Sequence, residues 1–228
     1  MKILIKGAGD LATGIAYEFW LAGHQVLMTD IEIPLAVRRT VSFSRAVYEG
    51  EAQVEQAKGV LVRNLEEALR TMQAGGIAVI VDEQAKIREE YRPDILIDSI
   101  MAKRNLGTRI GDAPVVIGIG PGFTAGLDCH YVIETQRGPS LGQVIREGSA
   151  IPNTGIPGEI AGYTIERLIR ASASGVIEPQ VRIGDLVKKG QLVAVTGGVP
   201  VYAQMSGIVR GMLQEGVQVE KGLKIGDI

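Results

Sequence analysis

The sequence feature that most constrains the fold is an apolar strand, a glycine-rich turn and a helix that follow one another within the first thirty residues. Lys2–Lys6 reads as a short buried strand, and Gly7 to Ala12 has the spacing Gly-x-Gly-x-x-Ala. In this pattern the first glycine permits a tight turn, the second lets backbone approach a pyrophosphate, and the alanine lets the helix pack closely on the strand. A second strand ends at Asp30, where a ribose-binding acid belongs. This order predicts a nucleotide-binding βαβ unit.

Further apolar runs alternate with helical stretches along the first half of the chain. Continuously apolar strands that alternate with helices are typical of a parallel sheet covered on both faces. The sequence therefore predicts an α/β, Rossmann-like parallel sheet. Its expected strands are Lys2–Lys6, Gln25–Asp30, Val60–Val62, Ile77–Val81, Ile95–Asp98 and Val115–Ile119, and its expected helices are Asp10–Ala22, Leu65–Met72 with Asn64 as N-cap, and Glu83–Tyr91.

Glycine is the outlier of the composition, with 30 glycines among 228 residues. They concentrate between Gly118 and about Gly162, where Gly-Pro-Gly and similar turns alternate with apolar anchors such as Phe123. Such anchors are unusual in a solvated linker, so this stretch is expected to be ordered. We expect a Rossmann-like nucleotide-binding domain over 1–125, a glycine/proline-rich segment packed on the crevice over 126–172, and a small β module over 173–228.

The β module is predicted from an internal repeat. Ser174–Ile177 recurs as Ser206–Val209, and the glycine-bounded block from Gly184 to Gly190 recurs 32 residues later. Neither copy can bury its apolar face alone, so the two are expected to pack together. The pattern resembles the barrel-sandwich hybrid of biotinyl and lipoyl domains, but the hairpin from Thr196 to Pro200 lacks an attachment lysine. A structural or docking module is the remaining interpretation.

Charge and cysteine content narrow the range of functions. The formal net charge is −2 and basic residues form no stripe, which argues against nucleic-acid binding. Apolar runs are strand-sized, which argues against a membrane span and leads us to expect a cytoplasmic protein. Cys129 is the single cysteine and there are two histidines, so we expect no disulfide and no metal site. A small buried thiol is the commoner role for such a cysteine.

Candidate site residues follow from their positions relative to the expected sheet edge. Each has a plainer alternative: Asp10 as a helix N-terminal acid, Asp30 as a turn residue, Arg38 and Arg39 as a surface pair, and the polar residues after Cys129 as an ion-paired loop. The candidate cofactor-binding residues are Gly7, Ala8, Gly9, Asp10, Asp30, Arg38, Arg39, Gly120, Gly122, Thr124 and Arg137, and the candidate proton-transfer residues are His130 and Glu134.

Four motifs together resemble one known family: Lys6–Gly14, Pro34–Phe43, Gly118–Gly126 and Val132–Gly138. The likeness is to YqeB-type selenium-dependent molybdenum hydroxylase system proteins, and it runs along almost the whole chain. It implies a cytoplasmic accessory protein encoded beside molybdenum hydroxylases and their maturation genes. The chain departs from the family pattern at Ser99, Cys129 and Pro139.

The resemblance and the glycine turn together favour a maturation protein that binds NAD(P) or a molybdopterin dinucleotide, with a molybdenum hydroxylase or its maturation proteins as partners. The first alternative is an NAD(P)-dependent oxidoreductase that uses His130 or Glu134. The second is a ligand-sensing scaffold that docks a partner through residues 173–228. Whether the chain forms a homo-oligomer is left open.

Overall fold

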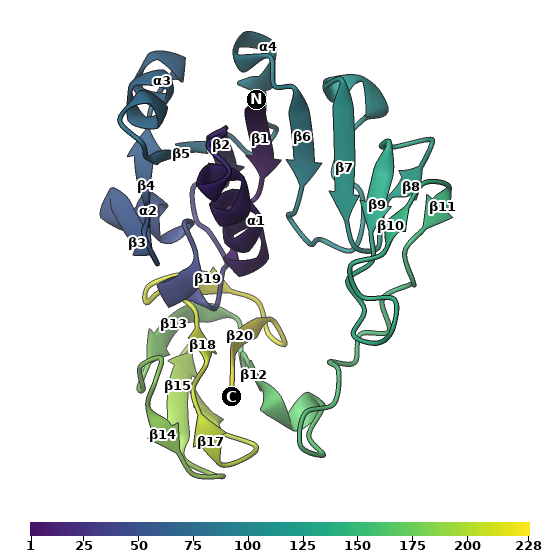
Figure 1. The fold of residues 1–228 in the computed structure, drawn as a ribbon. Helices are drawn as coiled ribbons and strands as arrows, with labels where there is room; N and C mark the ends of the chain where they lie inside the picture. The colour runs from purple at the N-terminus through teal and green to yellow at the C-terminus, as the bar shows by residue number, and fades with distance from the viewer. The chain divides into compact units, whose positions relative to one another are not determined.

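The structure is a computed structural model that describes residues 1–228 and divides them into two compact units (Figure 1). The N-terminal unit comprises Met1–Pro34 and Val41–Thr154, and the C-terminal unit comprises Leu35–Thr40 and Gly155–Ile228. The chain thus enters the C-terminal unit briefly at Leu35 before it completes the N-terminal one. The later division, at Thr154, falls inside the segment 126–172 that the sequence assigns to a connection.

A nine-stranded sheet forms the frame of the N-terminal unit, in the order β10-β9-β7-β6-β1-β2-β5-β4-β3. Strands β1, β2, β4, β5, β6, β7 and β9 are parallel, whereas the edge strands β3 and β10 are antiparallel to their neighbours. The strands are β1 Lys2–Lys6, β2 Gln25–Asp30, β3 Glu51–Val54, β4 Ala57–Val62, β5 Ile77–Val81, β6 Ile95–Asp98, β7 Val115–Ile119, β9 Tyr131–Ile133 and β10 Val144–Ile145, with a separate pair of β8 Thr124–Ala125 and β11 Gly148–Ser149.

The prediction of a Rossmann-like parallel sheet is therefore wrong in its pairing, because the sheet is mixed. Val54 pairs with Ala57 across a two-residue turn in which Glu55 has a φ of 49°, and this hairpin adds the antiparallel β3. In addition, β2 pairs with β5 rather than with the next parallel strand, β4. The strand order consequently departs from the 3-2-1-4-5-6 order of dinucleotide-binding folds.

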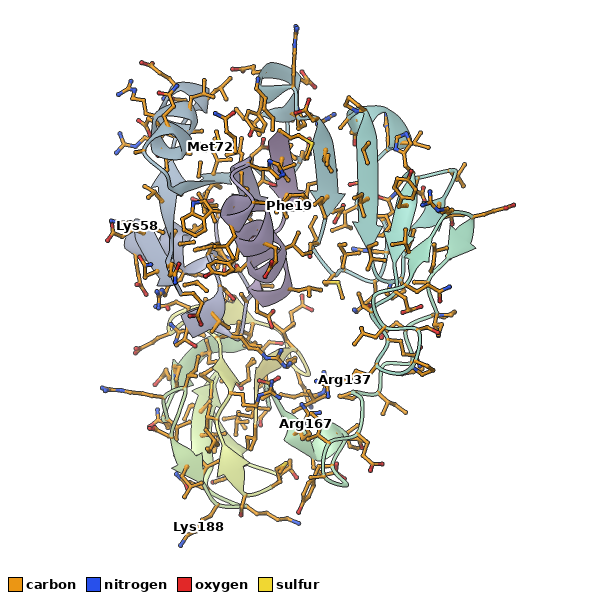
Figure 2. All side chains as sticks on the ribbon, viewed as in Figure 1. Phe19, Lys58, Met72, Arg137, Arg167 and Lys188 are labelled. Atoms are coloured by element: carbon orange, nitrogen blue, oxygen red, sulfur yellow. The ribbon has the colours of Figure 1, made fainter.

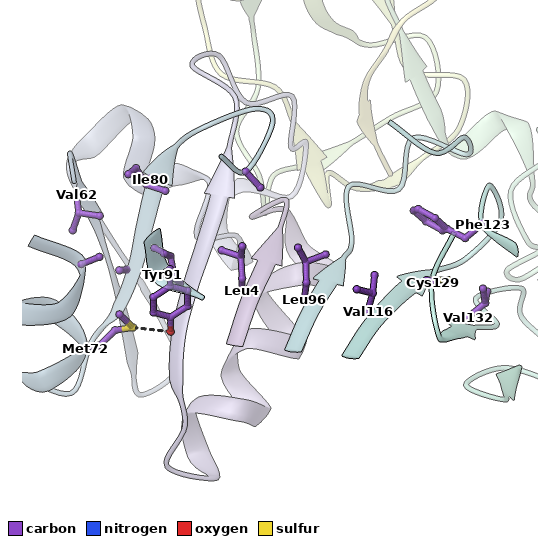
Figure 3. Close-up of a cluster of buried hydrophobic side chains, with 14 of the residues drawn as sticks. Leu4, Val62, Met72, Ile80, Tyr91, Leu96, Val116, Phe123, Cys129 and Val132 are labelled. Atoms are coloured by element: carbon purple, nitrogen blue, oxygen red, sulfur yellow. Dashed lines mark hydrogen bonds between the residues drawn. The ribbon is translucent and has the colours of Figure 1, made fainter. Parts of the chain in front are cut away.

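Helices and buried side chains cover both faces of this sheet. On one face Ala12 and Ala16 of α1 belong to the same buried cluster as Ile3 and Ile97. On the other face Leu4, Leu96 and Val116 lie side by side on adjacent strands, and the Tyr91 hydroxyl lies 3.6 Å from the sulfur of Met72 (Figure 3). The helices are α1 Asp10–Leu21, α2 Arg45–Glu49, α3 Leu65–Gln73 and α4 Arg88–Tyr91, with 3₁₀ turns η1 Arg39–Val41, η2 Ile110–Asp112 and η3 Ile165–Arg167.

The C-terminal unit consists of short antiparallel strands. They form a sheet of four (β16-β15-β13-β19), a sheet of three (β12-β20-β18) and a pair (β14-β17). Arg167, labelled in Figure 2, precedes β12 and donates to the Gly158 carbonyl at 3.0 Å. The strands are β12 Leu168–Arg170, β13 Gly175–Pro179, β14 Leu186–Val187, β15 Leu192–Thr196, β16 Val199–Tyr202, β17 Gly207–Ile208, β18 Gly211–Met212, β19 Gln218–Val219 and β20 Lys224–Asp227.

The two repeat copies are related by an approximate twofold in their hydrogen bonding. The Lys221 N–H donates to the Ser174 hydroxyl and the Lys189 N–H to the Ser206 hydroxyl, both at 2.9 Å. The ladders match as well, because β13 pairs with β19 as β17 pairs with β14, and β16 pairs with β15 as β12 pairs with β20. The repeat thus extends over the whole of 167–228, further than the sequence blocks indicate.

Candidate ligand site at the carboxyl edge of the sheet

The parallel strands of the N-terminal unit end at one edge, and most of the predicted site residues lie there. The arrowheads of β1, β6 and β7 point the same way in Figure 1. Ligands of open α/β sheets bind at this edge. It carries the Gly7–Gly9 turn after β1, Asp30 at the end of β2, Gly120 to Thr124 after β7, and Glu134 after β9.

The glycine turn has the expected conformation but makes contacts that the sequence does not reveal. Gly7 has a φ of +93°, and its N–H donates to the Thr29 carbonyl at 2.8 Å. A Cβ at this position would lie 3.0 Å from the Ser99 carbonyl oxygen. The glycine is therefore required because the loop after β6 approaches the turn closely.

Asp30 binds the turn itself. Its carboxylate accepts the Ala8 N–H at 3.2 Å and the Ile31 N–H at 2.8 Å. Burial raises the pKa of Asp30 from 3.8 to about 6, although these two hydrogen bonds act in the opposite direction. The Ala8 N–H is one of the groups that would face a pyrophosphate, and the Asp30 carboxylate already accepts its hydrogen bond. The negative charge of this carboxylate opposes the binding of a polyanion there. This arrangement gives a physical reason to abandon the predicted nucleotide role of the turn.

A buried ion pair that the sequence did not reveal joins the last residues of β1 and β6, and a hydroxyl from the loop after β6 completes it. The Lys6 ammonium lies 3.4 Å from the Asp98 carboxylate and donates to the Thr108 hydroxyl at 2.6 Å. That hydroxyl donates in turn to Asp98 at 2.5 Å. The three groups are buried and satisfy one another, as a buried pair requires. A lysine and an aspartate that end two otherwise apolar strands were the signal that could have revealed it.

Ser99 differs from the other buried polar residues of this edge because its side chain has no hydrogen-bond partner. Its side-chain hydroxyl is buried and has no hydrogen-bond partner, and the residue is only 4% exposed. The Ser99 N–H continues the ladder by donating to the Lys6 carbonyl at 2.9 Å. Because side chains alternate along a strand, Ser99 continues the face of Ile97, which is the face that α1 covers. The hydroxyl therefore lies on the side of the sheet where α1 begins.

The N-terminus of α1 adds donors to the same place. The helix begins at Asp10, and Gly9 is its N-cap with no side-chain hydrogen bond. The first N–H groups of a helix have no partner within the helix, and the helix dipole favours an anion beside them. Asp10 lies in the first turn of α1. This is the position of a helix N-terminal acid, which is the plainer of its two interpretations.

The glycines after β7 pack loops against one another. A Cβ on Gly120 would lie 2.7 Å from the Thr135 hydroxyl, and one on Gly122 would lie 2.7 Å from the Arg104 backbone. The Thr124 hydroxyl lies 3.0 Å from that of Ser149. These three predicted ligand contacts are therefore occupied by protein atoms.

The structure separates the predicted trio of His130, Glu134 and Arg137. His130 precedes β9, and its ring Nδ1 accepts the Val116 N–H at 3.0 Å, whereas Glu134 follows β9 at the opposite end of the strand. Glu134 accepts the N–H groups of Thr135, Gln136 and Ile151 at 2.7 to 2.8 Å. Burial opposes its ionisation, but these donors outweigh burial and hold the Glu134 pKa below its ordinary value. Glu134 thus anchors loops, and Arg137 is exposed.

The single cysteine is a buried thiol, as the sequence predicts, and the arginine pair is engaged elsewhere. Cys129 is fully buried, and burial raises the pKa of its thiol, as expected of a structural cysteine. Arg38 and Arg39 belong to the C-terminal unit, where Arg38 binds Asp227 and Arg39 binds Met212 and Gln214. They therefore do not complete the crevice of the N-terminal unit.

Two concave surfaces lie away from the carboxyl edge. One, of about 640 Å³, lies before β6 and β7 and is lined by charged residues that include Arg88 and Asp112. The other, of about 510 Å³, lies between β12 and β16 of the C-terminal unit. Three pairs of its lining residues are related by the repeat: Leu168 with Pro200, Arg170 with Tyr202, and Ser172 with Gln204.

No group of three or more His, Cys, Asp or Glu side chains is placed to hold a metal ion. None of the helices combines the length and apolar character that crossing a membrane requires.

The fold defines a two-unit protein with a mixed α/β sheet and a repeated β module. Comparison with known proteins finds a relative by sequence. No family model matches the chain. The chain is 47% identical over 226 residues to "Uncharacterized protein YqeB" of Escherichia coli (strain K12). The match covers 99% of this chain and 42% of that protein, so the chain spans less than half of the curated relative that it matches.

The solved structures that resemble this chain are named as desuccinylase and aspartoacylase proteins. One is a succinylglutamate desuccinylase/aspartoacylase from Rhodobacter sphaeroides, at 18% identity over 38% of this chain and 30% of that one, with a TM-score of 0.26. Another is an aspartoacylase family protein from Mesorhizobium loti, at 13% identity over 89% of this chain and 83% of that one, with a TM-score of 0.31. Likenesses this low do not carry an activity over to this chain.

Two predictions are corrected by the structure. The pairing of a Rossmann-like parallel sheet with a biotinyl/lipoyl-like sandwich is wrong, because the sheet is mixed and its strand order departs from that of dinucleotide-binding folds. The nucleotide-binding maturation function is wrong as well, because the Asp30 carboxylate already accepts the Ala8 N–H of the turn that was expected to bind a pyrophosphate. The Gly-x-Gly-x-x-Ala spacing alone was therefore misleading.

Proposed function

We propose that the N-terminal unit binds a compact small molecule bearing a single carboxylate, at the carboxyl edge between the Gly7–Gly9 turn and Ser99. The observation that carries this proposal is the buried, unpartnered hydroxyl of Ser99. A buried hydroxyl without a hydrogen bond costs about 1 to 3 kcal/mol. A ligand oxygen that accepts this hydrogen bond would recover that free energy.

The character of the ligand follows from the groups around Ser99. The N-terminus of α1 favours a negative charge, and the Ser99 hydroxyl supplies a donor on the same face. Asp30, held against Ala8, disfavours a second or third negative charge. A small monocarboxylate fits these conditions better than a phosphate chain.

Isothermal titration with a panel of small carboxylic acids, with NAD and FAD beside them, tests this proposal. We expect at least one acid to bind and Ser99→Ala to raise its Kd by about tenfold, the equivalent of one hydrogen bond of about 1.4 kcal/mol. Ser149→Ala, which removes an exposed hydroxyl from the same unit, is the matched control and should leave the Kd unchanged. Binding of no acid, or equal binding by both variants, would overturn the proposal.

The identity shared with YqeB also supports the family that the sequence motifs suggest. We infer that the chain and YqeB share a family, because the likeness extends over 99% of this chain. The link of that family to selenium-dependent molybdenum hydroxylases stays a prediction, as does a molybdenum hydroxylase as partner. Co-purification of the tagged full-length protein with such an enzyme would support the partner, and its absence from the purified complex would count against it.

A further inference from the structure

We propose that the C-terminal unit contains a recognition site for an extended segment with two consecutive arginines, and that residues 35–40 of the chain fill this site. The site lies along β18 and is defined by Gly211, Met212, Gln214 and Asp227. The segment and the site both belong to the C-terminal unit. The comparison of the two repeat copies is what distinguishes this site from ordinary loop packing.

The two copies differ in strand register where the segment binds. In the first copy Pro179 pairs with Ala194, and the repeat relation would place Gly211 opposite Gly226. Instead Gly211 pairs with Asp227, and Met212 takes the place opposite Gly226. The second copy therefore contains one extra residue, as in a β-bulge, and a bulge turns the following backbone groups in a new direction.

The shifted register presents Met212 to the segment. Its N–H donates to the Val37 carbonyl at 2.7 Å, and its carbonyl accepts from Arg39 Nε at 2.8 Å. The next residue, Leu213, returns to the ladder by donating to the Ile225 carbonyl at 2.8 Å. One residue thus offers both of its backbone groups outward, in the manner of a strand edge that receives an extended peptide.

Side chains on the second copy match the two arginines. Asp227 replaces Val195 of the first copy, and its carboxylate accepts from Arg38 and Lys224 at 2.9 and 3.0 Å. Burial alone would raise the Asp227 pKa, but these two cations outweigh it and lower the pKa. Gln214 accepts from Arg39 at 2.7 Å.

Gly211 provides the room for this contact. It replaces Pro179 of the first copy, and a Cβ in its place would lie 2.8 Å from the Asp227 carboxylate and 3.1 Å from the Val37 carbonyl oxygen. The second copy therefore differs from the first at each position that touches the segment.

Amide exchange measured by NMR on the full chain tests whether the segment occupies the site. In an Arg38→Gln/Arg39→Gln variant we expect the Met212 amide to exchange at least tenfold faster, because its acceptor on Val37 is released. The neighbouring Leu213 amide, bonded within the unit, should keep its rate and report that the unit remains folded. Glu178→Gln, which removes an exposed charge from the first copy, is the control and should change neither rate.

Binding in trans tests whether the site recognises sequence. A fluorescent peptide of residues 33–42 should bind the double variant at least tenfold more tightly than the wild-type chain, whose own segment competes at high effective concentration. The same peptide with glutamine at both arginines should lose this binding. Equal peptide binding by the two proteins, no binding by either, or an unchanged Met212 exchange rate in the double variant would overturn the proposal.

Discussion

At the scale of single residues, the charged groups of the carboxyl edge are bonded to other groups of the protein. Asp98 pairs with Lys6, Glu134 binds three backbone N–H groups, and Asp30 binds the glycine turn. The sequence indicated Asp30 and Glu134 by their positions at or after strand ends, but their partners include the backbone N–H groups of Ala8 and Ile151, which lie 22 and 17 positions away. Hydrogen bonds of that kind leave no pattern in the sequence.

Ser99→Ala should make the ligand-free protein more stable. The substitution removes a buried hydroxyl that has no partner, and relief of that penalty is worth about 1 to 3 kcal/mol. The measurement is the free energy of unfolding in urea for the wild type and the variant, without added ligand. A destabilised variant would mean that the hydroxyl is bonded in solution within the protein.

Asp30 should make stability depend on pH between about 4 and 6. Its pKa in the folded protein, about 6, exceeds the ordinary value of 3.8, so the folded state binds more protons in this range and stability falls as the pH rises through it. A shift of that size is worth roughly 2 to 3 kcal/mol. The difference in unfolding free energy between wild type and Asp30→Asn, followed from pH 4 to pH 7, isolates this contribution.

A flat difference across that range would contradict the pH prediction, since the carboxyl group would then titrate alike in the folded and unfolded states. His24→Gln, which alters a partly exposed side chain outside the edge, serves as a control for the effect of substitution itself.

At the scale of secondary-structure elements, the sequence predicted most of the sheet and little of its pairing. Strands β1, β2, β5, β6 and β7 have the predicted bounds, and Asn64 caps α3 by accepting the Glu67 N–H at 2.9 Å. Those elements are long apolar runs with clear turn signals. Strand β10 has two residues, and β3 joins through a hairpin without glycine, so neither gives a periodic signal.

Gly7→Ala should destabilise the N-terminal unit more than Gly23→Ala does. Both glycines have a positive φ, +93° and +78°, but only Gly7 meets other atoms where a Cβ would stand. Strain alone costs about 1 kcal/mol, and displacement of the Ser99 loop should add at least as much again. Urea unfolding of the two variants measures the difference, and equal costs would show that the Ser99 loop moves aside freely.

Ser174→Ala and Ser206→Ala should lower the free energy of unfolding by nearly equal amounts, because the repeat gives each hydroxyl an equivalent backbone N–H donor at 2.9 Å. Each bond is exposed, so we expect a loss of about 0.5 to 1 kcal/mol per variant. The urea midpoints of the two single variants are the measurement. Costs that differ by more than about 1 kcal/mol would indicate that the approximate twofold does not extend to energetics.

At the scale of the whole molecule, the sequence indicated both units but not that residues 35–40 belong to the C-terminal unit. The assignment of Arg38 and Arg39 to a ligand crevice followed from their position relative to the expected sheet edge, whereas their partners Asp227, Met212 and Gln214 lie 173 to 189 positions away. Such long-range pairs are set by the fold of the C-terminal repeat and have no local signal in the sequence.

Calorimetric titration of the wild-type protein beside Ser99→Ala tests most directly whether a ligand binds at the Ser99 edge. The structure predicts that a small monocarboxylate binds the wild type, that Ser99→Ala weakens this binding about tenfold, and that NAD and FAD do not bind. Binding of a dinucleotide with an affinity that Ser99→Ala leaves unchanged would contradict it.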